Sequence, residues 1–164
     1  MNTFLPENYK IPETSNYMKL SEGEHIFRIM SSAIVGWEYF TVENKPVRSK
    51  EEFEETPSDI KKDGRINNFW AFVVWNYGTN KLQILEVTQK TLQTPLKALA
   101  DNPKWGNPRA YDITIIRVGK TKQDTSYSVI PNPKEELPEE ITKLYEGSDI
   151  QLEKLYENGN PFGE

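Results

Sequence analysis

The sequence NNFWAFVVWNYGTNKLQILEVT, residues 67–88, contains two β-rich runs separated by Gly78, Thr79 and Asn80. Two runs of aromatic and β-branched residues around a short glycine-containing turn are typical of a β-hairpin. The first run is apolar on both faces. It therefore predicts either a central strand or a strand with one face that holds aromatic rings for a ligand.

The segment before this hairpin predicts a long, bent strand followed by a second hairpin. Residues 24–35, EHIFRIMSSAIV, alternate in part, and the alternation changes parity at residues 31–33, which favours a bend in a strand. Gly36 is typical of a close backbone approach at such a bend. Residues 36–48, GWEYFTVENKPVR, then predict a hairpin arm, and the charged residues 49–65 predict a loop.

The segment after the hairpin predicts one helix and two further strands. Leu92, Leu96 and Leu99 recur at helical intervals, so we expect a helix over residues 89–100 with Thr88 as its N-cap. Pro95 inside it predicts a kink or two short pieces. Strands are predicted at residues 110–118 and 125–130. Five strands with a helix between the third and fourth are the order of an OB-fold, so we expect a mainly β, five-stranded OB-fold-like barrel.

The charge distribution divides the chain into three parts. The net charge is -5, but residues 132–164 contain three cations and nine anions, which leaves 17 cations and 16 anions elsewhere. We therefore expect an N-terminal arm over residues 1–16, a binding domain over 17–131, and an acidic tail over 132–164 with short helices near 135–145 and 149–156. A nearly neutral domain can still present a basic face, because the local field depends on arrangement.

Composition excludes several classes of function. The chain has no cysteine, which excludes disulfides, thiolate zinc sites and thiol catalysis. The longest apolar run is the seven-residue FWAFVVW, too short for a membrane span, and the N-terminus has no apolar signal-peptide core. These features lead us to expect a cytoplasmic protein.

Catalytic signatures are weak in this sequence. His25 is the only histidine and has no nucleophile signature beside it. The tripeptide GKT at residues 119–121 lacks the glycine that a phosphate-binding loop needs at position 114, and strand residues follow it. The acidic run at residues 51–55 is typical of a solvated loop. We therefore expect no enzymatic activity, no cofactor and no metal.

Aromatic residues beside cations instead favour binding of a single-stranded nucleic acid. Such proteins stack bases on aromatic faces inside a cationic groove, and each stacked base contributes roughly 1–3 kcal/mol. Large aromatics in strands are more often core, so some of these rings are expected to be interior. Loop cations beside the rings include Lys50, Lys61, Lys120 and Lys122. The residues that we predict to bind nucleic acid are Trp37, Tyr39, Lys45, Arg48, Lys62, Arg65, Trp70, Trp75, Lys104, Trp105, Arg109 and Tyr127.

Several blocks of the chain also resemble a known family. GWEYF, KPVRS, NNFWAFVVWNY, LEVTQKT, WGNPRAYDI and YSVIP occur in collinear order between residues 9 and 133. They resemble a family of bacteriophage and prophage single-stranded DNA-binding replication proteins with an OB-fold core. The resemblance implies sequence-independent coating of single-stranded DNA in replication or recombination, without catalysis or a required metal, in the cytoplasm of a bacterial host. Shared blocks contain core residues as well as contacts; the candidates that fall in them are Trp37, Tyr39, Lys45, Arg48, Trp70, Trp75, Trp105 and Arg109.

The C-terminus gives a second resemblance. Bacterial single-stranded DNA-binding proteins often end in an acidic stretch with a Pro-Phe tip, and this chain ends NGNPFGE with Pro161 and Phe162, followed by two more residues. An exposed Phe162 would bind a basic, apolar pocket on a replication or recombination partner. The alternative is that Phe162 packs back on the domain. The charge split further predicts that the tail competes with DNA for its groove.

Two other functions remain open from the sequence. A β-barrel protein-interaction module, docking a partner or a second copy in a homo-oligomer, would use the apolar hairpin and leave the loop cations without a role. An OB-fold sugar-binding protein would explain the rings but not the cations.

Overall fold

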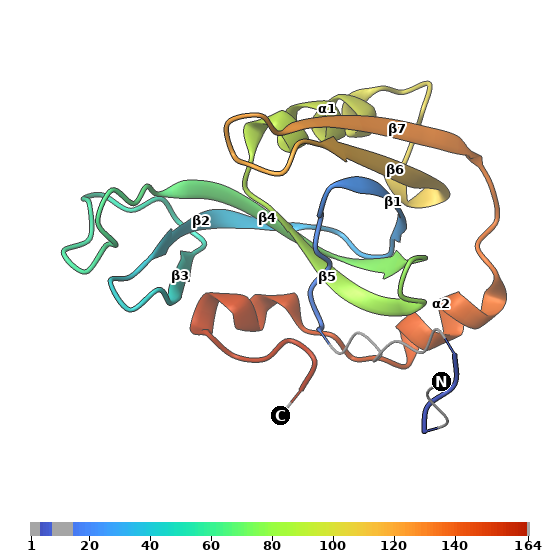
Figure 1. The fold of residues 1–164 in the computed structure, drawn as a ribbon, viewed down its shortest axis with the longest axis horizontal. Coiled ribbons are helices and arrows are strands. Elements are labelled where there is room, and N and C mark those ends of the chain that lie inside the picture. The colour runs from blue at the N-terminus through green and yellow to red at the C-terminus, as the bar shows by residue number, and fades with distance from the viewer. Residues whose placement is uncertain (1–3, 8–14, 164) are drawn as a thin grey trace.

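The computed structural model describes residues 4–7 and 15–163, and its main element is an antiparallel sheet of seven strands (Figure 1). The order along the main path is β3-β2-β4-β1-β6-β7, and β5 pairs with β4. The strands are β1 Gly23–Ile29, β2 Ile34–Phe40, β3 Pro46–Ser49, β4 Asn67–Asn76, β5 Lys81–Val87, β6 Tyr111–Val118 and β7 Ser126–Lys134.

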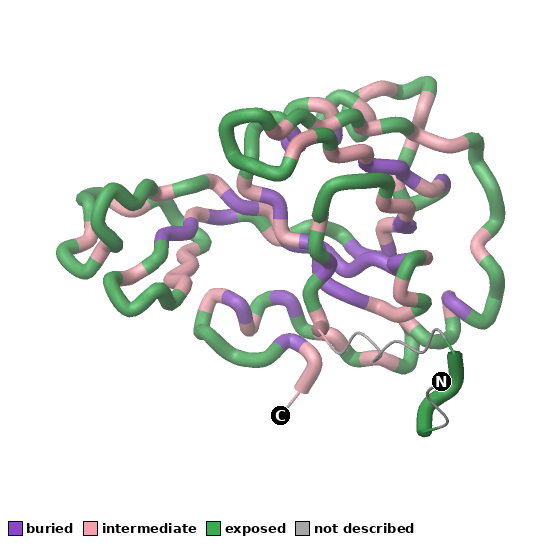
Figure 2. Tube along the Cα trace, in the orientation of Figure 1, coloured by how far each residue is buried: buried purple, intermediate pink, exposed green. Residues whose placement is uncertain are grey.

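The β4–β5 hairpin is confirmed, and β4 is the centre of the sheet. Asn76 pairs with Lys81 next to the predicted turn. One edge of β4 pairs with β5, and the other is divided between β2 and β1. Alternate residues of β4 enter two hydrophobic clusters, which Figure 2 shows as buried stretches. One cluster lies on the side of the sheet that α1 (Lys90–Asp101) covers, and we call it the inner core; it includes Trp70, Phe72 and Val74. The other lies on the side that the C-terminal segment covers, and we call it the outer core; it includes Phe69, Ala71, Val73 and Trp75.

The predicted long first strand bends where its alternation changes parity. It divides into β1 and β2, because Ser31 interrupts the ladder there. The Ser31 hydroxyl accepts a hydrogen bond from the Val73 amide at 2.9 Å, and the Met30 amide donates to the Val73 carbonyl at 2.8 Å. This break, together with the short strand β3 paired to β2, accounts for seven strands where the sequence predicted five.

A closed five-stranded barrel is not formed: within the described residues, β5 and β7 do not pair and the sheet is open. Helix α1 (Lys90–Asp101) follows β5 directly and packs against β7, and its Leu92 and Leu96 enter the inner core. α1 contains Pro95 as one continuous element. The predicted N-cap, Thr88, is wrong, because Gln89 occupies that position without a side-chain cap.

The C-terminal segment forms a layer of the fold. Helix α2 (Glu139–Glu146) and the 3₁₀ helix η2 (Leu152–Glu157) are shorter and later than predicted, since β7 extends to Lys134. Ile141, Leu152 and Leu155 are buried in the outer core, so this segment covers one face of the sheet (Figure 1). A short 3₁₀ helix, η1 (Pro108–Ala110), precedes β6.

The start of the chain is described only in part. Of the predicted N-terminal arm, residues 1–3 and 8–14 lie outside the described residues. The Asn16 carbonyl accepts a hydrogen bond from the Ile84 amide, which places this segment beside β5. Among the described helices, none combines the length and apolar composition needed to cross a bilayer.

Candidate nucleic-acid interface

A groove of about 1050 Å³ separates two projections of the sheet. One is the arm, which we define as β2, β3 and the following loop to residue 66, and the other is the β6–β7 hairpin (Figure 1). The start of α1 lies between them. The lining side chains come from all of these elements and are Trp37, Arg65, Ile66, Asn67, Asn68, Thr88, Gln89, Lys90, Thr91, Gln93, Arg117, Lys122, Thr125 and Tyr127.

Two further hollows share lining residues with the groove. A hollow of about 820 Å³ on the arm side shares Arg65, Asn67 and Lys122 with the groove. A second hollow, of about 520 Å³, shares Lys90 and Tyr127 with it and runs over Pro95 of α1. We refer to the groove and both hollows together as the basic track.

The basic track is strongly cationic. Its lining contains six cationic side chains, Lys61, Lys62, Arg65, Lys90, Arg117 and Lys122, and one carboxylate, Asp63. None of the six forms an ion pair with a carboxylate of the described residues. The basic track therefore carries a local positive field although the net charge of the chain is -5.

Hydrogen bonds hold two parts of this lining in place: the Arg117 side chain and the β6–β7 turn. Arg117 donates to the Leu20 carbonyl at 2.8 Å and to the Gly119 carbonyl at 3.2 Å, both neutral partners, and its charge also interacts with the Asp124 carboxylate without forming an ion pair. In the β6–β7 turn, the Thr121 hydroxyl and amide donate to the Asp124 carboxylate at 2.6 and 2.9 Å. These hydrogen bonds lower the pKa of Asp124 and order the turn that carries Lys122.

Of the six predicted rings, two line the basic track. Trp37 of β2 and Tyr127 of β7 are half-buried and line the groove, and Tyr127 also packs against the inner core. Trp75 is buried in the outer core, and Trp105 packs on the inner core with its ring 5.8 Å from that of Tyr111. Tyr39 is also away from the basic track: its ring is buried against Phe53, and its hydroxyl donates to Asp59 at 2.8 Å.

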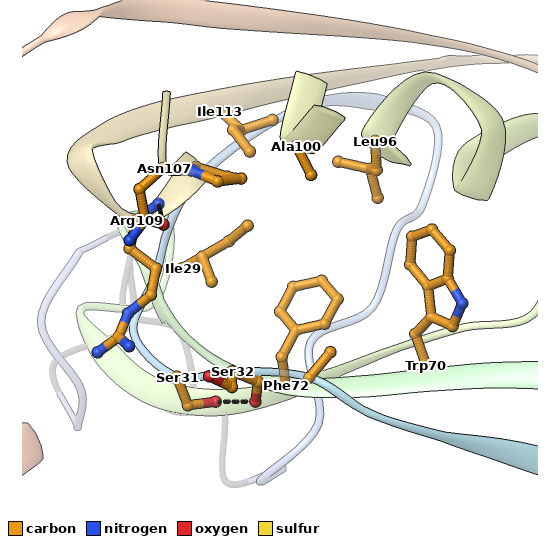
Figure 3. A pocket seen from close by; sticks show the side chains of 12 residues that line it. Ile29, Ser31, Ser32, Trp70, Phe72, Leu96, Ala100, Asn107, Arg109 and Ile113 are labelled. Carbon is orange, nitrogen blue, oxygen red and sulfur yellow. Dashed lines mark hydrogen bonds between the residues drawn. The ribbon is translucent and has the colours of Figure 1, made fainter. Parts of the chain in front are cut away.

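Trp70 lines a separate apolar pocket of about 330 Å³ (Figure 3). Phe72 points into it from the same strand, and Leu96 points into it from α1. Arg109 lies at its rim, where the guanidinium donates to the Met30 carbonyl. A pocket with apolar walls and one rim cation does not suit a polyanion, so Trp70 and Arg109 are separated from the basic track.

Like the predicted rings, only some of the predicted cations line the basic track. Lys62 and Arg65 line the basic track, whereas Lys104 is exposed in the loop before η1 and Lys45 is exposed in the β2–β3 turn, 3.7 Å from Glu43. Neither Lys45 nor Arg48 lines the basic track beside Trp37.

Arg48 is part of a buried charge cluster behind the arm. It lies 2.9 Å from both Glu38 and Glu86, and its side chain is 10% exposed. Arg48 is directly paired with Glu38 in the β2–β3 ladder, so both face away from Trp37, the neighbour of Glu38. Burial, with a further contribution from the Glu86 carboxyl, raises the pKa of Glu38 to about 8, although Arg48 opposes this shift.

Sequence reasoning missed Lys90 and Arg117 as candidate contacts. The cations predicted as contacts lie in turns and loops of the sequence, whereas Lys90 is the first residue of α1 and Arg117 lies in β6. Arg117 pairs directly with the predicted ring Tyr127. The β6–β7 register would have brought the two together, but it is not visible in the local sequence.

The C-terminal tip, for which an exposed Phe162 was one expectation, packs against the rest of the protein. Pro161 is buried, and Phe162 is half-buried against the outer core, as the alternative expectation had it. No residue of the described C-terminal segment lines the basic track, because the segment covers the opposite face of β4. Binding of a partner through Pro161 and Phe162 stays a prediction.

Comparison of the chain with protein-family models, curated proteins and solved structures gives no match.

Proposed function

We propose that this protein binds single-stranded DNA without sequence preference along the basic track. The observation that carries the proposal is the combination of six cations that form no ion pair with a described carboxylate and two half-buried rings, all lining the groove or the hollows that share its lining residues. Cations neutralise phosphates at any sequence, and a ring accepts any base because every base has a stacking face. Catalysis has no part in this proposal.

Two of the four amide side chains that line the groove are withdrawn from sequence readout. Specific readout uses Asn or Gln side chains that hydrogen-bond to base edges. Here the Asn68 amide donates to the Gly36 carbonyl at 2.9 Å, and the Gln93 amide donates to the carbonyls of Asn68 and Val87 at 3.1 Å. These two donors already have partners inside the protein, whereas Asn67 and Gln89 are exposed in the groove.

The connectivity supports an OB-fold-like reading of the open sheet. If β1 and β2 are taken as one bent strand, the succession is that strand, β4, β5, α1, β6 and β7. In the OB-fold, the loops after the first and fourth strands flank the binding face. The corresponding segments here are the arm and the β6–β7 turn, which border the groove. With the resemblance of the sequence blocks, this favours a role in phage-type replication or recombination in a bacterial cytoplasm.

The direct test is a titration of intrinsic tryptophan fluorescence with a thymine oligonucleotide at several salt concentrations, with a duplex of equal length as control. We expect quenching by the single strand. The binding constant obtained from it should fall by about 0.7 logarithmic units for each tenfold rise in salt and each phosphate neutralised. Trp37→Phe should remove most of the quenching, whereas Trp75→Phe should retain it, because Trp75 is buried on the outer side. Absence of salt-sensitive binding would reject the proposal.

A further inference from the structure

Phe40, the last residue of β2, presents an aromatic face beside a cluster of cations. Its side chain is 39% exposed, although the preceding Tyr39 is buried. The exposed ring forms one wall of the arm-side hollow, and the other walls include Lys61, Lys62 and Lys122. A single exposed ring on a surface is ordinary. A ring that shares a hollow with four cations, Arg65 being the fourth, repeats the composition of the groove itself.

The hollow is held together by backbone hydrogen bonds. The Phe40 carbonyl accepts a hydrogen bond from the Lys61 amide at 2.8 Å, and Thr41 forms a bridge with Ile60. The Lys61 ammonium in turn donates to the Asn44 side chain at 3.1 Å. The loop that carries the cations is thus fastened to the strand end that carries the ring. Such preorganisation lowers the entropy cost of binding.

The hollow is continuous with the groove. Arg65, Asn67 and Lys122 line both. Trp37 and Phe40 are three positions apart on β2, so their side chains leave the strand on opposite faces, and these shared residues form the connection between the two rings. A single-stranded DNA that stacks a base on Trp37 would therefore reach the Phe40 ring by passing along Arg65 and Lys122, which line both the groove and the hollow.

We propose that the arm-side hollow is an additional nucleotide subsite, in which Phe40 stacks a base and Lys62 and Lys122 contact its phosphates. This inference rests on the proposed function and extends it. It gives the single-stranded DNA a path that continues past Trp37 and Tyr127 to Phe40. The ligand class is one unpaired nucleotide of a single strand that also occupies the groove.

The test compares Phe40→Leu, Phe40→Tyr and a matched control, Val42→Ala, for binding to a long thymine oligonucleotide. Val42 is 70% exposed in the adjacent turn and lines no part of the hollow. We expect Phe40→Leu to weaken binding roughly 5- to 150-fold, the equivalent of one stacked base. Phe40→Tyr, which retains a ring, and Val42→Ala should bind as the parent does. Thermal unfolding of each variant reports whether the fold is retained.

The outcomes separate this inference from the proposed function. If the parent binds and Trp37→Phe removes the quenching, but Phe40→Leu binds as tightly as the parent, the subsite is rejected and the groove remains. Equal losses for Phe40→Leu and Phe40→Tyr would also reject stacking at this position. If the parent itself does not bind the single strand, both proposals are rejected.

Discussion

Arg48 and Arg65 both belong to the arm but have opposite roles, which a pair of substitutions separates. Arg48→Ala would leave Glu38 and Glu86 without their cation. Loss of one partner of a buried ion pair costs about 3–5 kcal/mol, and we expect the lower end because the Glu86 side chain is 19% exposed. Affinity for single-stranded DNA should remain in the folded fraction. Denaturant unfolding and binding titrations measure the two quantities.

Arg65→Ala should show the reverse. Arg65 is exposed on the basic track and forms no ion pair with a described carboxylate, so the free energy of unfolding should hardly change. Single-stranded DNA binding should weaken, and the salt slope should fall by about 0.7. A stable Arg48→Ala variant that loses DNA binding would contradict the assignment of the two residues.

Glu38 also gives the protein a pH dependence of known sign. The ordinary pKa of a glutamate is 4.5, and that of Glu38 in the folded protein is about 8. Between pH 4.5 and pH 8 the folded state therefore holds a proton that the unfolded state has lost. Stability should therefore decrease as pH rises through this window, by up to about 1.4 kcal/mol per pH unit. Glu38→Gln cannot titrate and should flatten the curve. Parallel curves for the two proteins, measured by urea unfolding at several pH values, would contradict this assignment.

At the scale of the element, the arm depends on a close approach of β2 and β3 at Gly36. A Cβ on Gly36 would lie 2.3 Å from the Ser49 carbonyl oxygen, which belongs to the backbone of β3 and cannot move alone. We expect Gly36→Ala to lower the free energy of unfolding by about 1–3 kcal/mol and to weaken DNA binding, since Trp37 follows directly.

The matched control for this prediction is Gly147→Ala. A Cβ there would meet only the Lys143 carbonyl at an ordinary 3.5 Å, and the residue is exposed after α2 with a φ of -87°. Its stability and DNA affinity should match those of the parent. Urea unfolding and the fluorescence titration are the measurements, and equal stability of both variants would show that the arm tolerates separation of β2 from β3.

At the scale of the whole molecule, the C-terminal segment stabilises the sheet from the side opposite the basic track. Leu155 is fully buried in the outer core, so Leu155→Ala should cost about 2–5 kcal/mol of stability without changing the DNA affinity of the folded protein. Deletion of residues 134–164 should have a larger effect, because it uncovers Phe69, Ala71 and Val73. A truncated protein that stays folded and binds DNA more tightly would instead support competition by the tail.

Local sequence was sufficient for the elements whose signals lie within one segment. The β4–β5 hairpin follows from two β-rich runs around Gly78, and the helix at residues 90–101 follows from the spacing of its leucines. The bend before Gly36 follows from a change of parity. Lys62, Arg65, Trp37 and Tyr127 were identified as candidates because they combine suitable chemistry with exposed or strand positions.

The tertiary structure decided which of these candidates share a surface. A strand presents alternate residues to opposite faces, so a one-residue difference places Trp37 in the groove and Glu38, with its partner Arg48, in a buried cluster behind it. Pairing of β6 with β7 sets Arg117 beside Tyr127, and packing of Leu155 turns an acidic tail into a structural layer. The sequence by itself determined the β-rich elements and the supply of rings and cations. Register and packing between distant segments decided the site, because both depend on contacts that no single segment contains.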